Sequence, residues 1–171
     1  MATYRSWMLA GYQQNDTMGR HGLQYLHTAG LNGHRYGNSW HNTDLSNWAS
    51  ITQSYDSPLD NSNGRFYCRS RGVIFSTVTL MYTNPQTRDV HIHLNKNGSQ
   101  ISLSNDHNGG GGSNGHTWNG MTTSAITNVA EGDYITVRAS MGNASDCYIY
   151  GGGTYNGWQV FYLPGAQNNQ G

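Results

Sequence analysis

The clearest pattern in the sequence is a two-residue alternation of apolar and polar side chains that starts near residue 64. Phe66 and Cys68 alternate with arginines over residues 65–71, and successive residues of a strand point to opposite faces of a sheet. Residues 73–82 are rich in β-branched and aromatic side chains and contain neither Gly nor Pro, which is typical of a central strand. This stretch therefore predicts two consecutive strands.

A third strand and a hairpin turn follow in the sequence. Val90, Ile92 and Leu94 alternate with polar residues, and the run ends at an Asn-Gly dipeptide, Asn97-Gly98. Asn-Gly is a strong hairpin signal, because both central residues of the favoured turn need a positive φ. We therefore predict a tight hairpin after this strand.

The rest of the chain predicts further strands, separated by turns that are rich in Gly and Asn. They cover residues 7–12, 23–28, 46–55, 100–104, 117–129, 135–138 and 155–163. No helical period longer than two turns appears in the chain. Ten short strands without a helix predict an all-β fold, either an antiparallel sandwich or a barrel.

Composition and charge exclude several classes of partner. The 171 residues are enough for one domain with its own core, and nine basic and nine acidic residues give a formal net charge of zero. We therefore expect no nucleic acid and no membrane as partner. Residues 1–14 lack the apolar core of a signal peptide, and no apolar run approaches the ~20 residues of a membrane span. We expect synthesis in the cytoplasm without a signal peptide.

Residues suited to catalysis are sparse. Glu131 is the only glutamate and lies with Asp133 in one predicted turn, whereas glycosidase chemistry needs two carboxylates opposed across a substrate. Residues 111–115 match the nucleophile-elbow pattern, but in a Gly-rich loop rather than a strand-to-helix turn. Cys68 lies on the predicted core face, which favours a buried thiol over a disulfide with Cys147. The sequence predicts no enzyme.

Two groups of residues resemble metal ligands. His91 and His93 share a strand face, where they would need a third ligand from a neighbouring strand; the alternative is a solvated or subunit-facing surface that responds to mild acid. The acidic and amide-rich residues 56–63 resemble a calcium loop, but Leu59 stands where the spacing needs an oxygen ligand. A polar turn is the alternative. We predict no cofactor, with calcium left open.

Four short motifs occur in order between residues 46 and 163. They are Gly64-x-Phe66-x-Cys68-x-x-x-Gly72, Leu94-x-Lys96-Asn97-Gly98, Gly132-Asp133-x-Ile135-x-Val137 and Tyr155-x-Gly157-Trp158. They resemble motifs of the jelly-roll heads of the complement component q and tumour necrosis factor superfamily, more closely those of the complement branch. The resemblance implies two jelly-roll sheets and a homotrimer packed about a threefold axis.

Aromatic residues are more abundant than one core needs. The 12 Tyr and 5 Trp favour an interface, because large aromatic side chains concentrate in interface cores; the alternative is an exposed or ligand-facing surface. Trp118, Tyr148 and Tyr150 are expected in or beside Gly-rich loops, where their rings can stack on sugars. They are the predicted ligand-binding residues.

These observations combine into one interpretation. We predict an all-β, antiparallel ten-strand jelly-roll sandwich, with an arm of short strands at residues 1–40, the jelly roll at 41–165 and a polar tail at 166–171. The low charge and the Gly-, Asn- and Ser-rich composition are typical of bacteriophage structural proteins. The leading hypothesis is a non-enzymatic homotrimer on the virion surface, a capsid decoration or fibre knob that contacts capsid or fibre proteins. The alternative is a lectin-like tip that binds host-surface glycan.

Overall fold

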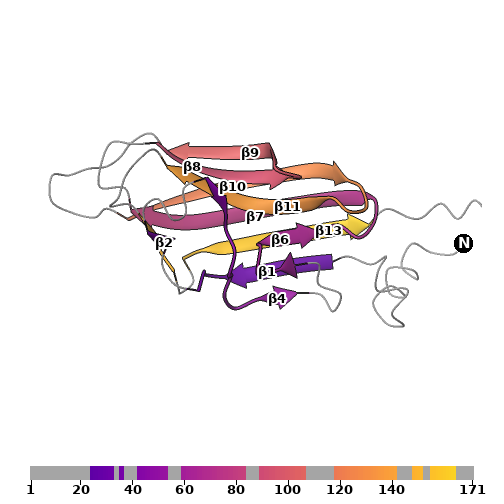
Figure 1. Ribbon diagram of the computed structural model, residues 1–171, viewed down its shortest axis with the longest axis horizontal. Coiled ribbons are helices and arrows are strands. Elements are labelled where there is room, and N and C mark those ends of the chain that lie inside the picture. Colours follow the sequence, from indigo (N-terminus) through magenta and orange to yellow (C-terminus); the bar gives the residue numbers. More distant parts are fainter. Residues whose placement is uncertain are drawn as a thin grey trace, which may run out of the picture.

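The protein folds into two antiparallel sheets that form a sandwich (Figure 1). In the computed structural model the described residues are 24–32, 35–36, 42–53, 59–83, 89–106, 118–141, 148–151 and 155–164. These ranges contain no helix that is long and apolar enough to cross a membrane. The predicted strand at residues 7–12 and the tail at 166–171 lie outside them. The predicted all-β jelly-roll sandwich is confirmed.

The first sheet is organised around β7, which spans Gly72–Thr83. Its other strands are β1 (Gln24–Ala29), β2 (Arg35–Tyr36), β4 (Thr52–Gln53), β10 (Trp118–Val129), β12 (Tyr148–Ile149) and β13 (Gly157–Pro164). β10 pairs with the whole of β7 on one side, and β13 lies between β7 and β1 on the other. Figure 1 shows β1 (indigo) and β13 (yellow), from opposite ends of the chain, side by side.

The second sheet is organised around β11, which spans Tyr134–Met141. Its other strands are β3 (Thr43–Asp44), β5 (Leu59–Asp60), β6 (Arg65–Tyr67), β8 (Val90–Lys96) and β9 (Ser99–Asp106). The predicted hairpin joins β8 to β9, with φ of 52° at Asn97 and 80° at Gly98. At one edge of the sandwich, the hydroxyls of Ser102 in β9 and Thr123 in β10 form a hydrogen bond of 2.6 Å between the two sheets.

Two predicted strands are shorter in the structure. The strand predicted at residues 65–71 ends at Tyr67. The strand predicted at 46–55 is reduced to β4, because Asn47 and Ser50 have positive φ values of 62° and 46° and interrupt the extended backbone. Between them, Trp48 turns inward, where the side chain of Asn61 binds its backbone N–H and C=O at 2.7 and 3.0 Å.

The predicted N-terminal arm overlaps the sandwich. β1 lies within residues 1–40, yet it pairs with β13 along its full length and with β4 on its other side. Leu26 on its inner face is fully buried. The first sheet therefore begins before residue 41, and of the predicted arm residues 1–23 lie outside the described ranges.

An aromatic centre fills the space between the sheets. Trp158 of β13 lies 5.6 Å from Trp48 and 6.5 Å from Phe66, measured between ring centroids. The indole N–H of Trp158 donates to the hydroxyl of Ser76 at 2.9 Å, and the hydroxyl of Tyr162 donates to the carbonyl of Ser70 at 2.6 Å. Each buried polar group of these rings thus has a partner, as a buried donor requires.

Candidate functional site

The functional candidates lie on the outer face of the first sheet. Along β7, β13 and β1 the inward residues are buried and the alternate residues face outward. The pairing register places the outward residues of neighbouring strands in rows across the sheet, because residues opposite one another share a face. This face has three parts: an aromatic end, a polar pocket and an apolar region.

The aromatic end cluster consists of Trp118, Tyr148, Tyr150 and Tyr155. Trp118 begins β10 and Tyr148 begins β12, and both stand opposite Thr83 of β7 from its two sides. The ring of Trp118 lies 5.2 Å from that of Tyr148 and 5.1 Å from that of Tyr150, each edge to face. The structure therefore brings the three predicted ligand-binding residues together.

Tyr155 extends this cluster and was not among the predicted site residues. Its ring lies 5.5 Å from that of Tyr150, at an interplanar angle of 83°, and 55% of the residue is exposed. In the sequence it is the first residue of the predicted strand 155–163 and counts only as part of the Tyr-x-Gly-Trp motif. Its position beside Tyr150 depends on β12, which fills the space next to β7 beyond the end of β13.

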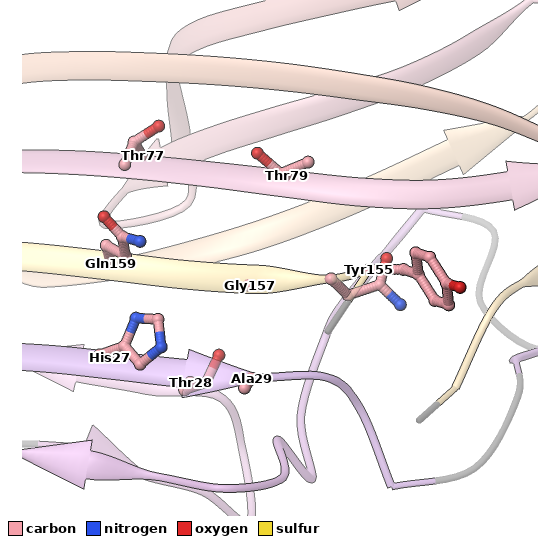
Figure 2. Close-up of a pocket in the computed structure, with 9 residues that line it drawn as sticks. His27, Thr28, Ala29, Thr77, Thr79, Tyr155, Gly157 and Gln159 are labelled. Atoms are coloured by element: carbon pink, nitrogen blue, oxygen red, sulfur yellow. The ribbon is translucent and has the colours of Figure 1, made fainter. Parts of the chain in front are cut away.

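A pocket of about 340 Å³ adjoins Tyr155. Figure 2 shows Thr77, Gln159 and His27 in one row across β7, β13 and β1, with Tyr155 on the far side of Gly157. The next row is Thr79, Gly157 and Ala29. Because Gly157 has no side chain and Ala29 has a small one, this row leaves a hollow on the outer face of the sheet, next to the row of Thr77, Gln159 and His27.

Asn156 fixes the backbone at the entrance of the pocket. Its side chain accepts a hydrogen bond from the N–H of Met81 and donates one to the carbonyl of Tyr150. Its own carbonyl accepts from the N–H of Gly30 at 2.7 Å. Asn156 is 3% exposed, so the side chain and backbone carbonyl of one buried residue bind three chain segments next to Tyr155.

The apolar stripe lies on the same face beyond the pocket. Its residues are Tyr25, Val73, Phe75, Ile126, Phe161 and Leu163, from four adjacent strands. Phe75 and Phe161 stand opposite each other with ring centroids 6.4 Å apart. Ile126, opposite Phe75 on β10, is 73% exposed. Contiguous exposed apolar patches of this kind often mark interaction surfaces.

The histidines predicted as metal ligands lie on the second sheet. The rings of His91 and His93 stack with centroids 5.9 Å apart. Both ring nitrogens of His93 are already engaged, Nδ1 with Gln100 at 2.8 Å and Nε2 with Ser140 at 3.3 Å. Among the described residues no group of three His, Cys, Asp or Glu side chains is placed to hold a metal ion.

The predicted calcium loop forms a polar turn between β5 and β6 in its described part. The carboxylate of Asp60 accepts hydrogen bonds from the backbone and hydroxyl of Ser62 and from the amide of Asn63, at 2.6–3.0 Å. These bonds, led by the Ser62 hydroxyl, hold the pKa of Asp60 below its usual value. Asn61 binds Trp48 instead. The carboxylate thus closes the turn, and Asp56 lies outside the described ranges.

The other reactive groups have structural roles where they are described. Cys68 is a buried free thiol, and burial raises its pKa to about 12. Asp133 accepts hydrogen bonds from the backbone of Ala130 and the side chain of Asn97, which lower its pKa and tie two turns together. The elbow-like residues 111–115 and Cys147 lie outside the described ranges.

No protein-family model and no curated protein sequence matches this chain. Solved structures of the complement and tumour necrosis factor type do match it in fold. The globular domain of zebrafish complement 1qA superposes with a TM-score of 0.53 and 11% identity, covering 80% of this chain and 94% of that one. Eiger TNF from S. frugiperda gives 0.57 and 13%, covering 86% and 96%.

Murine APRIL gives a TM-score of 0.58 with 10% identity, covering 82% of this chain and 99% of that one. These TM-scores do not favour the complement branch over the other, so that preference stays a prediction. The chain has the jelly-roll fold that the complement component q and tumour necrosis factor proteins share.

Proposed function

We propose that this protein is a non-enzymatic jelly-roll head that assembles with copies of itself into a homotrimer. The observation that carries the proposal is the apolar stripe, which crosses four strands of one sheet face. The family resemblance of the sequence motifs implies the same arrangement, three copies about a threefold axis. The large number of aromatic residues in the sequence, 12 Tyr and 5 Trp, is a third observation that supports the homotrimer.

The size of the stripe supports a contact between proteins. A Phe or Tyr side chain has about 150–250 Å² of surface. The six side chains of the stripe are 38–73% exposed and together present about 400–500 Å² of apolar surface to solvent. The largest patches on monomers are about 300–600 Å² and are often functional. Burying the exposed part of Leu163 alone contributes about 1–2 kcal/mol per copy. The stripe would form the apolar centre of an interface of about 800 Å² per partner.

The stripe occupies one face of the molecule, and this position affects which symmetry an assembly of identical chains can have. A contact between the stripe and a different surface of the next copy is heterologous, and such contacts close into a ring when the rotation allows. Three copies form the smallest such ring. The chain's low charge leaves little long-range repulsion between copies, since the formal net charge is zero.

The test is the mass of the protein in solution, measured by light scattering after gel filtration. Leu163→Asp places a carboxylate in the stripe, and Leu103→Asp is a matched control, because Leu103 is 42% exposed on the second sheet. We expect three chains for the wild type and for Leu103→Asp, and one chain for Leu163→Asp. A wild type that runs as a single chain would refute the proposal.

We extend this proposal to the surface of a virus particle, where the trimer would decorate a capsid or tip a fibre. Its support is compositional, the low charge and the Gly- and Asn-rich texture of the sequence. Immunogold labelling of purified particles tests the location. A deletion that tests attachment by the N-terminal segment should remove only residues 1–22, because removing residues up to 40 would also delete β1. A truncated trimer that stays on the particle would exclude that segment as the attachment.

A further inference from the structure

We propose that Asn97 is a site of spontaneous deamidation, and that its hydrogen bonds to Asp133 and Tyr134 control the rate. The site lies at the end of the second sheet, so the inference goes beyond the self-assembly proposed above and does not depend on it. In this reaction the backbone nitrogen of Gly98 attacks the side-chain carbonyl carbon of Asn97, and the amide group leaves as ammonia with the proton that the nitrogen loses. Water then opens the succinimide ring at either carbonyl, which gives aspartate or isoaspartate.

The sequence offers several places for this reaction. Seven Asn-Gly dipeptides occur in the chain, and such a step hinders the reaction least, because glycine has no side chain beside its backbone nitrogen. Four of the seven lie wholly within the described ranges. Their asparagines are Asn63, Asn97, Asn119 and Asn156. The structure distinguishes these four by the surroundings of the glycine nitrogen.

Gly98 is the one of these four glycines that is both exposed and outside the strand pairing. Gly64 is buried, and its N–H donates to a carbonyl within its own turn at 2.9 Å. Gly120 and Gly157 lie in β10 and β13, where the backbone cannot rotate without breaking the pairing with β7. Gly98 lies at the tip of the β8–β9 hairpin, and its N–H makes no hydrogen bond to another described residue. The nitrogen that must attack is therefore accessible at this step.

The side chain of Asn97, in contrast, is held by the turn that precedes β11. Its amide donates to the carboxylate of Asp133 at 2.7 Å, and its carbonyl accepts from the N–H of Tyr134 at 2.9 Å. The backbone N–H of Asn97 donates to the carbonyl of Tyr134 at 3.0 Å. We call these three bonds the Asn97 latch. Ring closure draws the side-chain carbon onto the nitrogen of Gly98, and the two side-chain bonds of the latch oppose that movement.

The reaction would destroy the latch that controls it. Both products have a carboxylate and no side-chain amide, so neither can donate to Asp133. Hydrogen bonds from Ala130 and Asn97 lower the pKa of Asp133, which is therefore charged at neutral pH. Two carboxylates would then face each other, and the ammonium of Lys96, 3.2 Å from Asp133, can compensate one of them. Deamidation should therefore separate the β8–β9 hairpin from the turn before β11 irreversibly.

The experiment follows deamidation of the full chain at pH 8 by mass spectrometry of proteolytic fragments, in buffer and in urea that unfolds the protein. In buffer we expect Asn97 to react first among the four described asparagines, yet about tenfold or more slowly than in urea, because the latch has to open. Asp133→Ala should speed the reaction at Asn97 in the folded protein about tenfold or more. A hydrogen bond to a charged group contributes at least the ~1.4 kcal/mol that corresponds to this factor.

Asp60→Ala is the matched control, because Asp60 accepts from the amide of Asn63 at 2.7 Å in a different turn. This variant should leave the rate at Asn97 unchanged. A second readout is stability: Asn97→Asp, which mimics the product, should lower the urea midpoint. Adding Asp133→Asn to it restores one amide and one carboxylate with their positions exchanged, and should recover part of the loss.

Three results would overturn the proposal. The first is an equal rate at Asn97 in buffer and in urea, a comparison that uses the wild type and holds even if a variant fails to fold. The second is a folded Asp133→Ala variant, verified by circular dichroism, whose Asn97 reacts no faster than that of the wild type. The third is earlier deamidation in buffer at Asn63, Asn119 or Asn156.

Discussion

Replacing Gly64 by alanine should destabilise the fold far more than the same change in another turn. Gly64 has a φ of +71°, and an added Cβ would lie 2.0 Å from the carbonyl oxygen of Leu45. That carbonyl accepts the indole N–H of Trp48 at 3.2 Å, and the N–H of Leu45 donates to Val137 at 2.7 Å. The backbone at Leu45 is therefore held from two sides and has little freedom to move away.

The magnitude follows from these contacts. The left-handed conformation costs a residue with a side chain about 1–2 kcal/mol. Displacing the Leu45 carbonyl would leave the buried indole N–H of Trp48 without its acceptor, which costs about a further 1–3 kcal/mol. We expect Gly64→Ala to lose about 3–5 kcal/mol in total, a large part of the ~5–15 kcal/mol by which domains of this size are stable.

Gly132→Ala is the matched control. Gly132 has a φ of +84°, but an added Cβ would meet no atom within 4 Å, so only the conformational cost applies. Urea unfolding followed by tryptophan fluorescence gives the free energy of unfolding of both variants. The effect of alanine on the unfolded chain is the same in each and cancels in their difference. Losses that agree within about 0.5 kcal/mol would show that the close approach at Gly64 is not rigid.

Three further predictions concern buried and hydrogen-bonded groups. In a Cys147→Ser background, Cys68 should fail to react with a thiol reagent at pH 8 until the protein is unfolded, because burial raises its pKa to about 12; rapid reaction of the native protein would contradict this. Ser76→Ala should cost about 1–3 kcal/mol by leaving the Trp158 indole unpaired, and much less in a Trp158→Phe background; equal costs in both would exclude that bond. Backbone and side-chain donors lower the pKa of Asp133 in the folded protein. Its charge therefore stabilises the fold at pH values above the pKa of about 4 in the unfolded chain. This stabilisation is lost as the pH falls through the lower pKa of the folded state. The gap in unfolding free energy between wild type and Asp133→Asn should therefore narrow from pH 7 to pH 3, and a constant gap would contradict the pairing.

The sequence was sufficient for the fold because its local signals agree with one another. The β-branched and aromatic residues of 73–82 predicted β7, and Asn97-Gly98 predicted the hairpin, since both signals depend on neighbouring residues only. Why the motifs need glycine at these positions cannot be predicted from the sequence, because it depends on contacts between strands. An added Cβ at Gly72 would lie 2.4 Å from the carbonyl of Leu163, a contact between β7 and β13 that needs the sheet order to be known.

The candidate site was predicted in part for the same reason. A period of two assigns residues of one strand to a face, but it does not say which strands are neighbours. Trp118, Tyr148 and Tyr150 were predicted from residue type and from their place in or beside Gly-rich loops, and the structure joins them because β10 and β12 flank the end of β7. Tyr155 and His27 were missed, because the pocket exists only once β13 lies beside β1.

The place of β13 between β7 and β1 also sets the order of events during synthesis. A nascent chain that has emerged as far as residue 150 already carries β1 and β7, but the strand that joins them has not yet been made. Both would present open backbone edges, which are templates for pairing with other chains. Chains that stall before residue 157 should therefore depend on chaperones, and the sheet closes only when its last strand is inserted.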